Sequence, residues 1–259
     1  MISVVINTYN AAKSLRRTLD SVKSFDEILV CDMESTDETL DIAREYGCTI
    51  VTFPKGDFNI CEPARDFAIH SAKHEWVLVI DADEEVPAKL RDYLYEECLK
   101  DRYDALQIPR KNFMFFRFTP SSYPDYQTRF LRRDKVSWPP TIHSHPIVDG
   151  KIGRIDRNRK DLALVHLQDS MHKQLDKLNV YSDNEAVRRQ DENVSIFDLV
   201  FKPLVQFFKV YFLKGGFLLG RVGYIQAQKE AFYKLSVLAK MYENELAEKM
   251  DPKSDNGSC

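Results

Sequence analysis

Short apolar runs alternate with helical patterns along the first hundred residues of the chain. The apolar runs predict four strands, at residues 2–6, 27–31, 48–53 and 76–80. The stretches between them repeat apolar positions at helical spacing and predict three helices, over residues 12–23, 36–46 and 62–73. Strands that are apolar almost throughout are typical of a parallel sheet that helices cover on both faces. The expected fold class is therefore α/β.

The pattern changes twice after this region. Aromatic clusters, prolines and short strand-like pieces fill residues 105–169, which predicts an antiparallel extension able to hold a second substrate. Residues 170–250 return to helical periodicity, and the polar tail 251–259 is expected to be disordered. The chain is thus predicted to combine a mostly parallel sheet in residues 1–104, an antiparallel extension and a C-terminal helical region.

A dense acidic group follows the fourth predicted strand. Four of the five residues from Asp81 to Glu85 are acids, directly after an apolar run. Residues two apart in an extended segment share a face, so Asp81 and Asp83 present their carboxylates to the same side. Such oxygen ligands suit Mg²⁺ or Mn²⁺, and Mg²⁺ completes its shell with water and substrate phosphates. A solvated acidic turn before a helix is the alternative, and Glu84 and Glu85 are assigned to it.

Two other strand ends carry compatible polar residues. Asp32 directly follows the second predicted strand, where its carboxylate can accept hydrogen bonds from a nucleobase or a ribose. The first strand ends in the sequence NTYN, which contains Thr8, Tyr9 and Asn10. Ligands of parallel α/β sheets bind beyond the carboxyl ends of the strands. Three such ends with polar side chains predict a nucleotide site.

Composition narrows the classes of partner. The 259 residues carry a formal net charge of −3, which gives no global reason to expect nucleic acid as a partner. The five cysteines are scattered and never spaced as C-x-x-C, which argues against a disulfide framework or a structural zinc site and is typical of a reducing compartment. The chain begins with an apolar strand rather than a basic leader, so a cytoplasmic location is expected.

Several segments together resemble a known family. The sequences VVINTYN, EILVCDMESTDET and EPARDFAIHSAKHEWVLVIDADEE, in this order and spacing, are similar to the family-2 glycosyltransferases of the GT-A fold. Later segments, YPDYQTRFLRR and HLQDSMHKQLDKLNVYSDNEA among them, resemble the bacterial subgroup that glycosylates the lipopolysaccharide core or related surface glycans. The resemblance implies that residues 1–104 bind a nucleotide sugar and that residues 105–169 form the acceptor-side half of a GT-A domain.

The same resemblance implies a donor site and a metal site. Donor-binding residues would lie at the three strand ends and on the third predicted helix: Thr8, Tyr9, Asn10, Asp32, Arg65, Asp81 and Ala82. Asp81 and Asp83 match the family's D-x-D motif, with Asp83 the direct ligand of Mg²⁺ or Mn²⁺. His166 is a second candidate near the metal or the phosphate, with a structural histidine as the alternative. The implied reaction is inverting transfer of a sugar from a nucleotide diphosphate, expected to be UDP, to a glycan or lipid-linked acceptor.

Inverting transfer also needs a base for the attacking acceptor hydroxyl. Asp125 follows Tyr123-Pro124 and precedes a strand-like piece, and we assign it as that base, with a plain turn residue as the alternative. Gln127 and Arg129 alternate with Asp125 along one strand face and are assigned to the acceptor or the diphosphate.

Two positions depart from the family pattern. Met33 and Glu34 follow the second strand where the family usually has a small residue or glycine, so a different loop conformation is expected. Ser144, in the sequence TIHSHP, stands where the subgroup tends to have the acid of a His-Glu pair, which removes one candidate base. His143 and His145 could share a face, but no third zinc ligand is identifiable.

Residues 196–220 are the most hydrophobic stretch of the chain. Drawn as one helix, they place Asp198, Lys202, Gln206 and Lys209 in a single polar stripe. These charges, with a proline and a Gly-Gly pair, argue against a spanning helix. We expect an amphipathic helix at the inner face of a bacterial cytoplasmic membrane, with its lysines near anionic headgroups. Burial against the catalytic domain or in a homo-oligomer is the alternative.

Two other functions stay open on these patterns. A sugar-nucleotide nucleotidyltransferase would use a similar sheet, although NTYNAAKS lacks the glycine-rich loop expected after its first strand. A catalytically silent nucleotide-sugar-binding membrane protein is the third possibility, because Glu34 and Ser144 depart from the family pattern. Release of nucleoside diphosphate would distinguish a glycosyltransferase from a nucleotidyltransferase, which releases pyrophosphate.

Overall fold

The chain folds into two compact units. The structure is a computed structural model that describes residues 1–56, 61–141, 144–167 and 171–250. The first unit comprises residues 1–113 and 122–167, and the second comprises residues 114–121 and 168–259. The predicted disordered tail, residues 251–259, and His143 lie outside the described residues.

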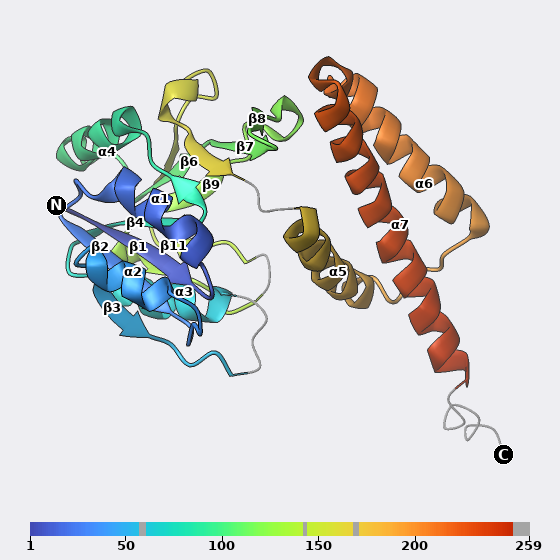
Figure 1. Ribbon diagram of the computed structural model, residues 1–259, viewed down its shortest axis with the longest axis horizontal. Helices are drawn as coiled ribbons and strands as arrows, with labels where there is room; N and C mark the ends of the chain where they lie inside the picture. Colours follow the sequence, from blue (N-terminus) through green and yellow to red (C-terminus); the bar gives the residue numbers. More distant parts are fainter. Residues whose placement is uncertain (57–60, 142–143, 168–170, 251–259) are drawn as a thin grey trace. The chain divides into compact units, whose positions relative to one another are not determined.

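One large sheet organises the first unit (Figure 1). Its strand order is β12-β6-β9-β4-β1-β2-β3. Its four neighbouring parallel strands are β4 (Trp76–Asp81), β1 (Ile2–Thr8), β2 (Glu27–Asp32) and β3 (Thr49–Thr52). The other strands are β9 (Gln127–Arg132), antiparallel to β4, then β6 (Ala105–Ile108), antiparallel to β9, and β12 (Ile152–Arg154), parallel to β6. The predicted mostly parallel sheet with an antiparallel extension is confirmed.

Helices cover both faces of this sheet. They are α1 (Ala12–Val22), α2 (Thr39–Glu45), α3 (Glu62–His70) and α4 (Ala88–Lys100). Successive residues of β1 point to opposite faces, so Val4 belongs to one core, with Leu15 of α1 and Leu90 of α4. Val5 belongs to the other core, with Ala68 of α3. This two-sided burial explains why the strands are apolar almost throughout.

A smaller group of strands lies next to the acidic sequence. β5 (Glu84–Glu85) pairs antiparallel with β13 (Leu164–Leu167), and β13 pairs parallel with β7 (Arg110–Met114). The remaining short elements are β8 (Arg117–Phe118), β10 (Val136–Ser137), β11 (Ile147–Val148) and the 3₁₀ turns Pro120–Ser122, Arg133–Lys135 and Lys160–Leu162. The pairing of β5, β13 and β7 joins segments that are far apart in the sequence.

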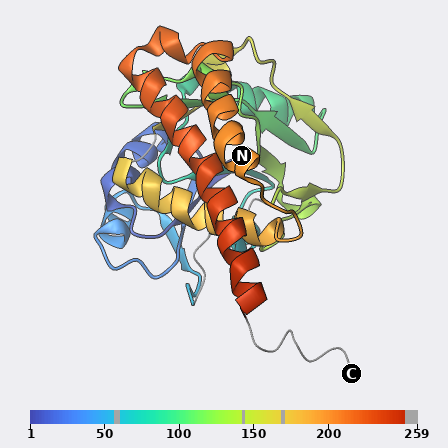
Figure 2. The same cartoon turned by 90° about the vertical axis from the view of Figure 1, so that its right-hand side faces the viewer.

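Helices make up most of the second unit. These are α5 (Met171–Arg188), α6 (Ile196–Phe208) and α7 (Arg221–Met250), and α6 and α7 lie side by side in both views (Figures 1 and 2). Residues 196–220 do not form the single helix drawn from the sequence. A π-helical turn (Lys209–Leu213) and a 3₁₀ turn (Gly216–Leu219) follow α6 instead. No described helix is both long and apolar enough to cross a bilayer.

Two glycines set the close packing of the α6–α7 connection. A Cβ atom added to Gly223 of α7 would lie 1.8 Å from the backbone oxygen of Gly216. We predict that Gly223→Ala lowers the free energy of unfolding by about 1–3 kcal/mol, because the two backbones must separate. Alanine has a higher helix propensity than glycine, and this alone would raise the free energy of unfolding by about 1 kcal/mol. Chemical denaturation of Gly223→Ala, with Ala239→Gly on the exposed side of α7 as a measure of helix preference, decides between them.

Candidate active site

Three strand ends meet at one edge of the large sheet. Thr8 at the end of β1 is in register with Asp32 at the end of β2, and Asn7 is in register with Asp81 at the end of β4. The sheet therefore brings together the strand ends that sequence analysis singled out. This is the edge beyond which parallel α/β sheets bind their ligands.

The Asp32 carboxylate is buried and held in a fixed orientation. It accepts hydrogen bonds from the Thr8 hydroxyl at 2.9 Å, the Ser35 hydroxyl at 2.6 Å and the Ser35 backbone N–H at 2.8 Å. Ser35 is therefore engaged with Asp32, and α2 begins only at Thr39, three residues later than predicted. Asp32 and its partners form a preorganised polar end to β2.

The loops beyond β1 and β2 use left-handed backbone conformations. Asn10 has φ +50° and Glu34 has φ +60°. Asn10 Oδ1 accepts a hydrogen bond from the Thr36 backbone N–H at 2.8 Å, and Glu34 Oε2 accepts one from the Lys55 backbone N–H at 3.2 Å. The conformation at Glu34 is one that glycine adopts more readily, by about 1–2 kcal/mol. Tyr9 is 47% exposed at the same edge.

Two buried arginines clamp Asp81. Arg65 Nη2 lies 2.7 Å from Asp81 Oδ1, and Arg129 Nη2 lies 2.7 Å from Asp81 Oδ2. Burial alone would raise the pKa of Asp81, but Arg129, Arg65 and Arg110 together hold it well below the usual range. Asp81 is therefore an ionised anchor whose two oxygens are both engaged.

The same arginines keep unpartnered hydrogen-bond donors. Among the described residues, Arg65 Nη1, Arg129 Nε and Arg129 Nη1 are buried without a hydrogen-bond partner. Both polar side-chain atoms of Asn7 are in the same state. The Arg65 guanidinium also lies over the Trp138 ring, with 5.1 Å between the guanidinium carbon and the ring centroid. Guanidinium N–H groups without a hydrogen-bond partner favour the binding of an anionic ligand.

Glu84 corrects one expectation. The sequence predicts a solvated turn there, but the Glu84 side chain is fully buried. Glu84 Oε1 accepts a hydrogen bond from Arg110 Nη1 at 2.7 Å, and Oε2 accepts one from the Asp81 backbone N–H at 3.0 Å. β5 pairs with β13, and β13 pairs with β7, so Arg110 of β7 comes within reach of Glu84 and neutralises its charge. Glu85, by contrast, is partly exposed and pairs with Arg17.

Asp83 and His166 come together from separate elements. Asp83 follows β4, His166 lies in β13, and 3.4 Å separates Asp83 Oδ2 from His166 Nε2. His166 Nδ1 lies 2.6 Å from the side-chain oxygen of Asn112, so Nδ1 carries a proton and Nε2 faces the carboxylate. Burial lowers the pKa of His166, but the hydrogen bond to Asp83 and the attraction of its negative charge together outweigh this and raise the pKa above its usual value.

Three side chains hold the candidate base Asp125. Its Oδ2 accepts hydrogen bonds from Arg110 Nε at 2.9 Å and Asn112 Nδ2 at 2.8 Å, and its Oδ1 accepts one from Gln127 Nε2 at 2.9 Å. Burial would raise the pKa of Asp125, but Arg110 and the other donors lower it overall. Asn112 thus links Asp125 to His166, because its amide nitrogen faces the first and its oxygen faces the second.

Arg110 and Asn112 were missed by sequence analysis. Both lie in β7, inside the irregular stretch where no periodicity marked a strand end. The only available signal was a basic and an amide side chain two residues apart, which on a strand share a face.

Ser144, the residue in place of the subgroup's acid, has a structural role. Its hydroxyl accepts a hydrogen bond from Trp138 Nε1 at 3.1 Å and donates one to the backbone oxygen of Pro139 at 2.6 Å. Trp138 in turn stacks with Arg65. Ser144 therefore supports the loop behind the arginine clamp.

The polar groups at this edge fit a divalent cation only in part. No group of three or more His, Cys, Asp or Glu side chains in the described ranges is arranged to hold a metal ion. Asp83 and His166 offer one carboxylate and one imidazole, which suits an ion that takes its other ligands from water and phosphate. Both oxygens of Asp81 are engaged by arginine, which disfavours Asp81 as a ligand of a cation.

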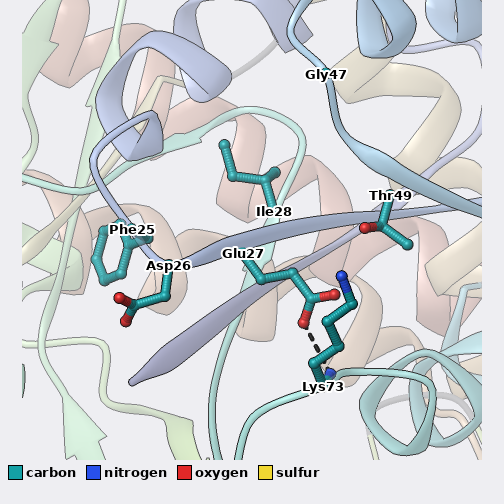
Figure 3. Close-up of a pocket in the computed structure, with 7 residues that line it drawn as sticks. All are labelled: Phe25, Asp26, Glu27, Ile28, Gly47, Thr49 and Lys73. Atoms are coloured by element: carbon teal, nitrogen blue, oxygen red, sulfur yellow. Dashed lines mark hydrogen bonds between the residues drawn. The ribbon is translucent and has the colours of Figure 1, made fainter.

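A pocket of about 270 Å³ lies at the opposite edge of the sheet (Figure 3). Its residues include Glu27 at the start of β2, Thr49 at the start of β3 and Lys73, whose backbone N–H donates to Glu27 at 2.8 Å. These are the amino ends of the strands. The pocket contains none of the candidate site residues.

The chain is similar to bacterial glycosyltransferases along nearly its whole length. An uncharacterised glycosyltransferase of Rickettsia felis is 30% identical over 96% of this chain and 92% of its own. The lipopolysaccharide core biosynthesis glycosyltransferase LpsC of Rhizobium meliloti is 25% identical over 93% of this chain and 92% of its own.

Solved structures share the fold at low sequence identity. The mannosyltransferase PcManGT from Pyrobaculum calidifontis, in complex with GDP-Man and Mn²⁺, is 13% identical with a TM-score of 0.56, over 94% of this chain and 87% of its own. TarS of S. aureus with UDP-GlcNAc is 15% identical with a TM-score of 0.51, over 95% of this chain and 92% of its own. The predicted GT-A-type fold is confirmed. The model of glycosyl transferase family 2 matches residues 3–162, and the chain belongs to that family.

Proposed function

We propose that this protein transfers a sugar, with inversion, from a UDP-linked donor to a glycan or lipid-linked acceptor of bacterial surface glycan synthesis. The observation that carries the proposal is the meeting of Asp32, Asp81 and Asp83 at one sheet edge, beside Asp125 and His166. Family membership gives the reaction class, and the similarity to a lipopolysaccharide core enzyme supports the class of acceptor.

The donor nucleotide is assigned to the edge formed by β1, β2 and β4. Thr8, Tyr9, Asn10 and Asp32 would contact the nucleoside, with Asp32 accepting hydrogen bonds from base or ribose. Asp81 and Ala82 would contact the rest of the donor. Ala82 is fixed by its backbone oxygen, which accepts a hydrogen bond from Thr18 at 2.9 Å.

The diphosphate is assigned to the arginines and a divalent cation. The unpartnered nitrogens of Arg65 and Arg129 are the donors we assign to it. Asp83 and His166 would hold Mg²⁺ or Mn²⁺, which when bound stabilises the negative charge of the departing diphosphate. Mn²⁺ in the PcManGT complex supports this assignment.

Asp125 is the proposed base, and Gln127 orients it. Oδ2 is taken by Arg110 and Asn112, which leaves Oδ1 as the oxygen to receive the proton of the acceptor hydroxyl. The base removes that proton as the hydroxyl attacks the sugar carbon, and the bond from that carbon to the diphosphate oxygen breaks.

Donor binding and product analysis test the proposed function. Thermal-shift measurements with UDP- and GDP-sugars, with Mn²⁺ and with a chelator, should show stabilisation by one donor class. Release of nucleoside diphosphate is expected, whereas release of pyrophosphate would favour a nucleotidyltransferase. A protein that binds the donor but neither hydrolyses nor transfers it would be a silent binder.

We predict that Asp125→Asn lowers turnover by about 100- to 10,000-fold and leaves donor affinity unchanged. The base acts on the acceptor, so its loss appears in kcat and not in nucleotide binding. Because Arg110 lowers the pKa of Asp125, the wild-type base stays ionised at neutral pH, and its own protonation reduces turnover only at pH values below the usual range for a carboxylate. Hydrolysis or transfer assays check both points, with Asp149→Asn, 94% exposed, as the control. Near-normal turnover in Asp125→Asn would move the base elsewhere.

A further inference from the structure

The outer side of α6 and the turns that follow it is apolar. Leu199 packs beside Val237 and Leu238 of α7, so the opposite side of α6 faces away from the helix pair. The exposed large apolar residues there are Ile196, Phe197, Val200, Phe201, Leu204, Val205, Phe208, Phe212, Leu213, Phe217 and Leu218. We call this set the apolar face. Water does not favour a contiguous surface of this kind.

The segment that carries the apolar face is also basic. Residues 199–229 contain Lys202, Lys209, Lys214, Arg221 and Lys229 and no acidic residue. The chain as a whole has a net charge of −3, so this run is a local departure from its average. Lys202 is partly neutralised by Asp198, 2.7 Å away, which leaves Lys209, Lys214 and Arg221 as exposed basic residues around the turns.

The turns between α6 and α7 hold the apolar face in a defined shape. Phe207 and Tyr211 pack their rings against Tyr224 of α7, at centroid distances of 5.8 and 6.0 Å. The backbones of Gly216 and Gly223 touch, which fixes the connection between the helices. With these residues facing inward, Leu213 and Leu218 are left 84% and 76% exposed.

We propose that the apolar face and its basic residues dock on an anionic lipid surface. Leucine and phenylalanine side chains would enter the boundary between headgroups and acyl chains, and Lys209, Lys214 and Arg221 would lie at headgroup level. A second copy of this chain is a poorer occupant, because a symmetric contact would bring two acid-free basic segments together. Lipid of opposite charge satisfies both the apolar and the basic residues.

Membrane docking is separate from the transfer reaction and does not depend on it. It adds a place of action, a membrane surface, where an acceptor carried on lipid would be within reach. The test therefore uses the full-length protein without any nucleotide sugar. If the protein does not bind lipid, the expected donor binding and product release are unaffected. If donor binding or product release fails, the expected lipid binding is unaffected.

Co-sedimentation with vesicles tests the charge component. At about 0.01 M ionic strength, where the Debye length is about 30 Å, wild type should bind vesicles of equal parts phosphatidylglycerol and phosphatidylcholine. It should bind phosphatidylcholine alone more weakly. Lys209→Glu with Lys214→Glu should lower partitioning by at least about thirtyfold. The control, Lys23→Glu with Lys89→Glu, makes the same charge change on exposed lysines of the first unit and should bind like wild type.

A second pair of variants tests the apolar component. Leu213→Gln with Leu218→Gln should lower partitioning about a hundredfold without loss of stability, because both side chains are already exposed. Leu99→Gln, at an 88% exposed leucine of α4, is the matched control and should bind like wild type. Wild type that ignores the anionic vesicles overturns the proposal, as does full binding by the leucine variant. Sedimentation velocity showing a dimer that the leucine variant dissolves would assign the apolar face to a second copy instead.

Discussion

Asp83→Ala is expected to abolish Mn²⁺-dependent binding of UDP or GDP while the protein stays folded. Asp83 lies 3.4 Å from His166, whereas the two oxygens of Asp81, the other acid of the D-x-D pair, are both engaged by arginine. Its loss leaves a histidine that can be neutral, so no buried charge is stranded. The loss of affinity should exceed the roughly 10- to 100-fold that removal of an outer-shell partner costs.

Titration calorimetry of Asp83→Ala with UDP and with GDP, in Mn²⁺ and in a chelator, measures this effect. Asp134→Ala removes an exposed acid of the first unit and should bind like wild type. Thermal unfolding of both variants checks that the fold is intact. If Asp83→Ala keeps the Mn²⁺-dependent nucleotide affinity of wild type, Asp83 is not a ligand of the metal.

The sheet edge was predictable because parallel strands end together. An acid that directly follows an apolar run must lie where that strand surfaces, and Asp32 and Asp81 both do. Neighbouring parallel strands then bring such residues side by side without any further information. The pairing of Asp83 with His166 needed more, because it depends on the position of β13 beside β5.

The buried charge network could not be derived from local pattern. Glu84 and Arg110 are 26 residues apart and meet only because β13 pairs with both β5 and β7. β5 and β7 are too short and too polar to show an alternating pattern. The sequence therefore favoured a solvated turn at Glu84, although the tertiary fold supplies an arginine that makes its burial possible.

The C-terminal stretch shows a limit of periodicity of another kind. A helical projection of residues 196–220 shows which side chains share a face, but not which face another helix covers. The packing of α7 on Leu199, Phe207 and Tyr211 decides that, and the helical run ends before Gly215, whose backbone is left-handed with φ +72°. The side of α6 that faces away from α7 is therefore the side rich in phenylalanine and leucine, which the polar stripe alone did not predict.

Asp81→Asn is expected to lower the free energy of unfolding by about 3 kcal/mol, in contrast to Asp83→Ala. Asp81 is the acid that both Arg65 and Arg129 contact at 2.7 Å, and the two guanidinium groups are almost fully buried. Removal of one partner from a buried ion pair costs about 3–5 kcal/mol, because a charge is left without compensation. We expect the lower end of this range because the Asp81 side chain is 28% exposed, so water partly solvates the charges that remain.

A double-mutant cycle separates this effect from loss of packing. Arg129→Met removes one of the two stranded cations while keeping an apolar side chain of similar length. The double variant Asp81→Asn, Arg129→Met should therefore be more stable than the sum of the two single losses predicts, by about 1–3 kcal/mol. Urea denaturation of the four proteins gives the coupling free energy. Strictly additive losses would mean that Asp81 and Arg129 do not stabilise each other, and Asp81 would then act in donor binding alone. The alternative result is that the double variant is more stable than additivity predicts and that only Asp83→Ala loses donor affinity. In that case Asp81 supports the structure of the site, and Asp83 binds the metal.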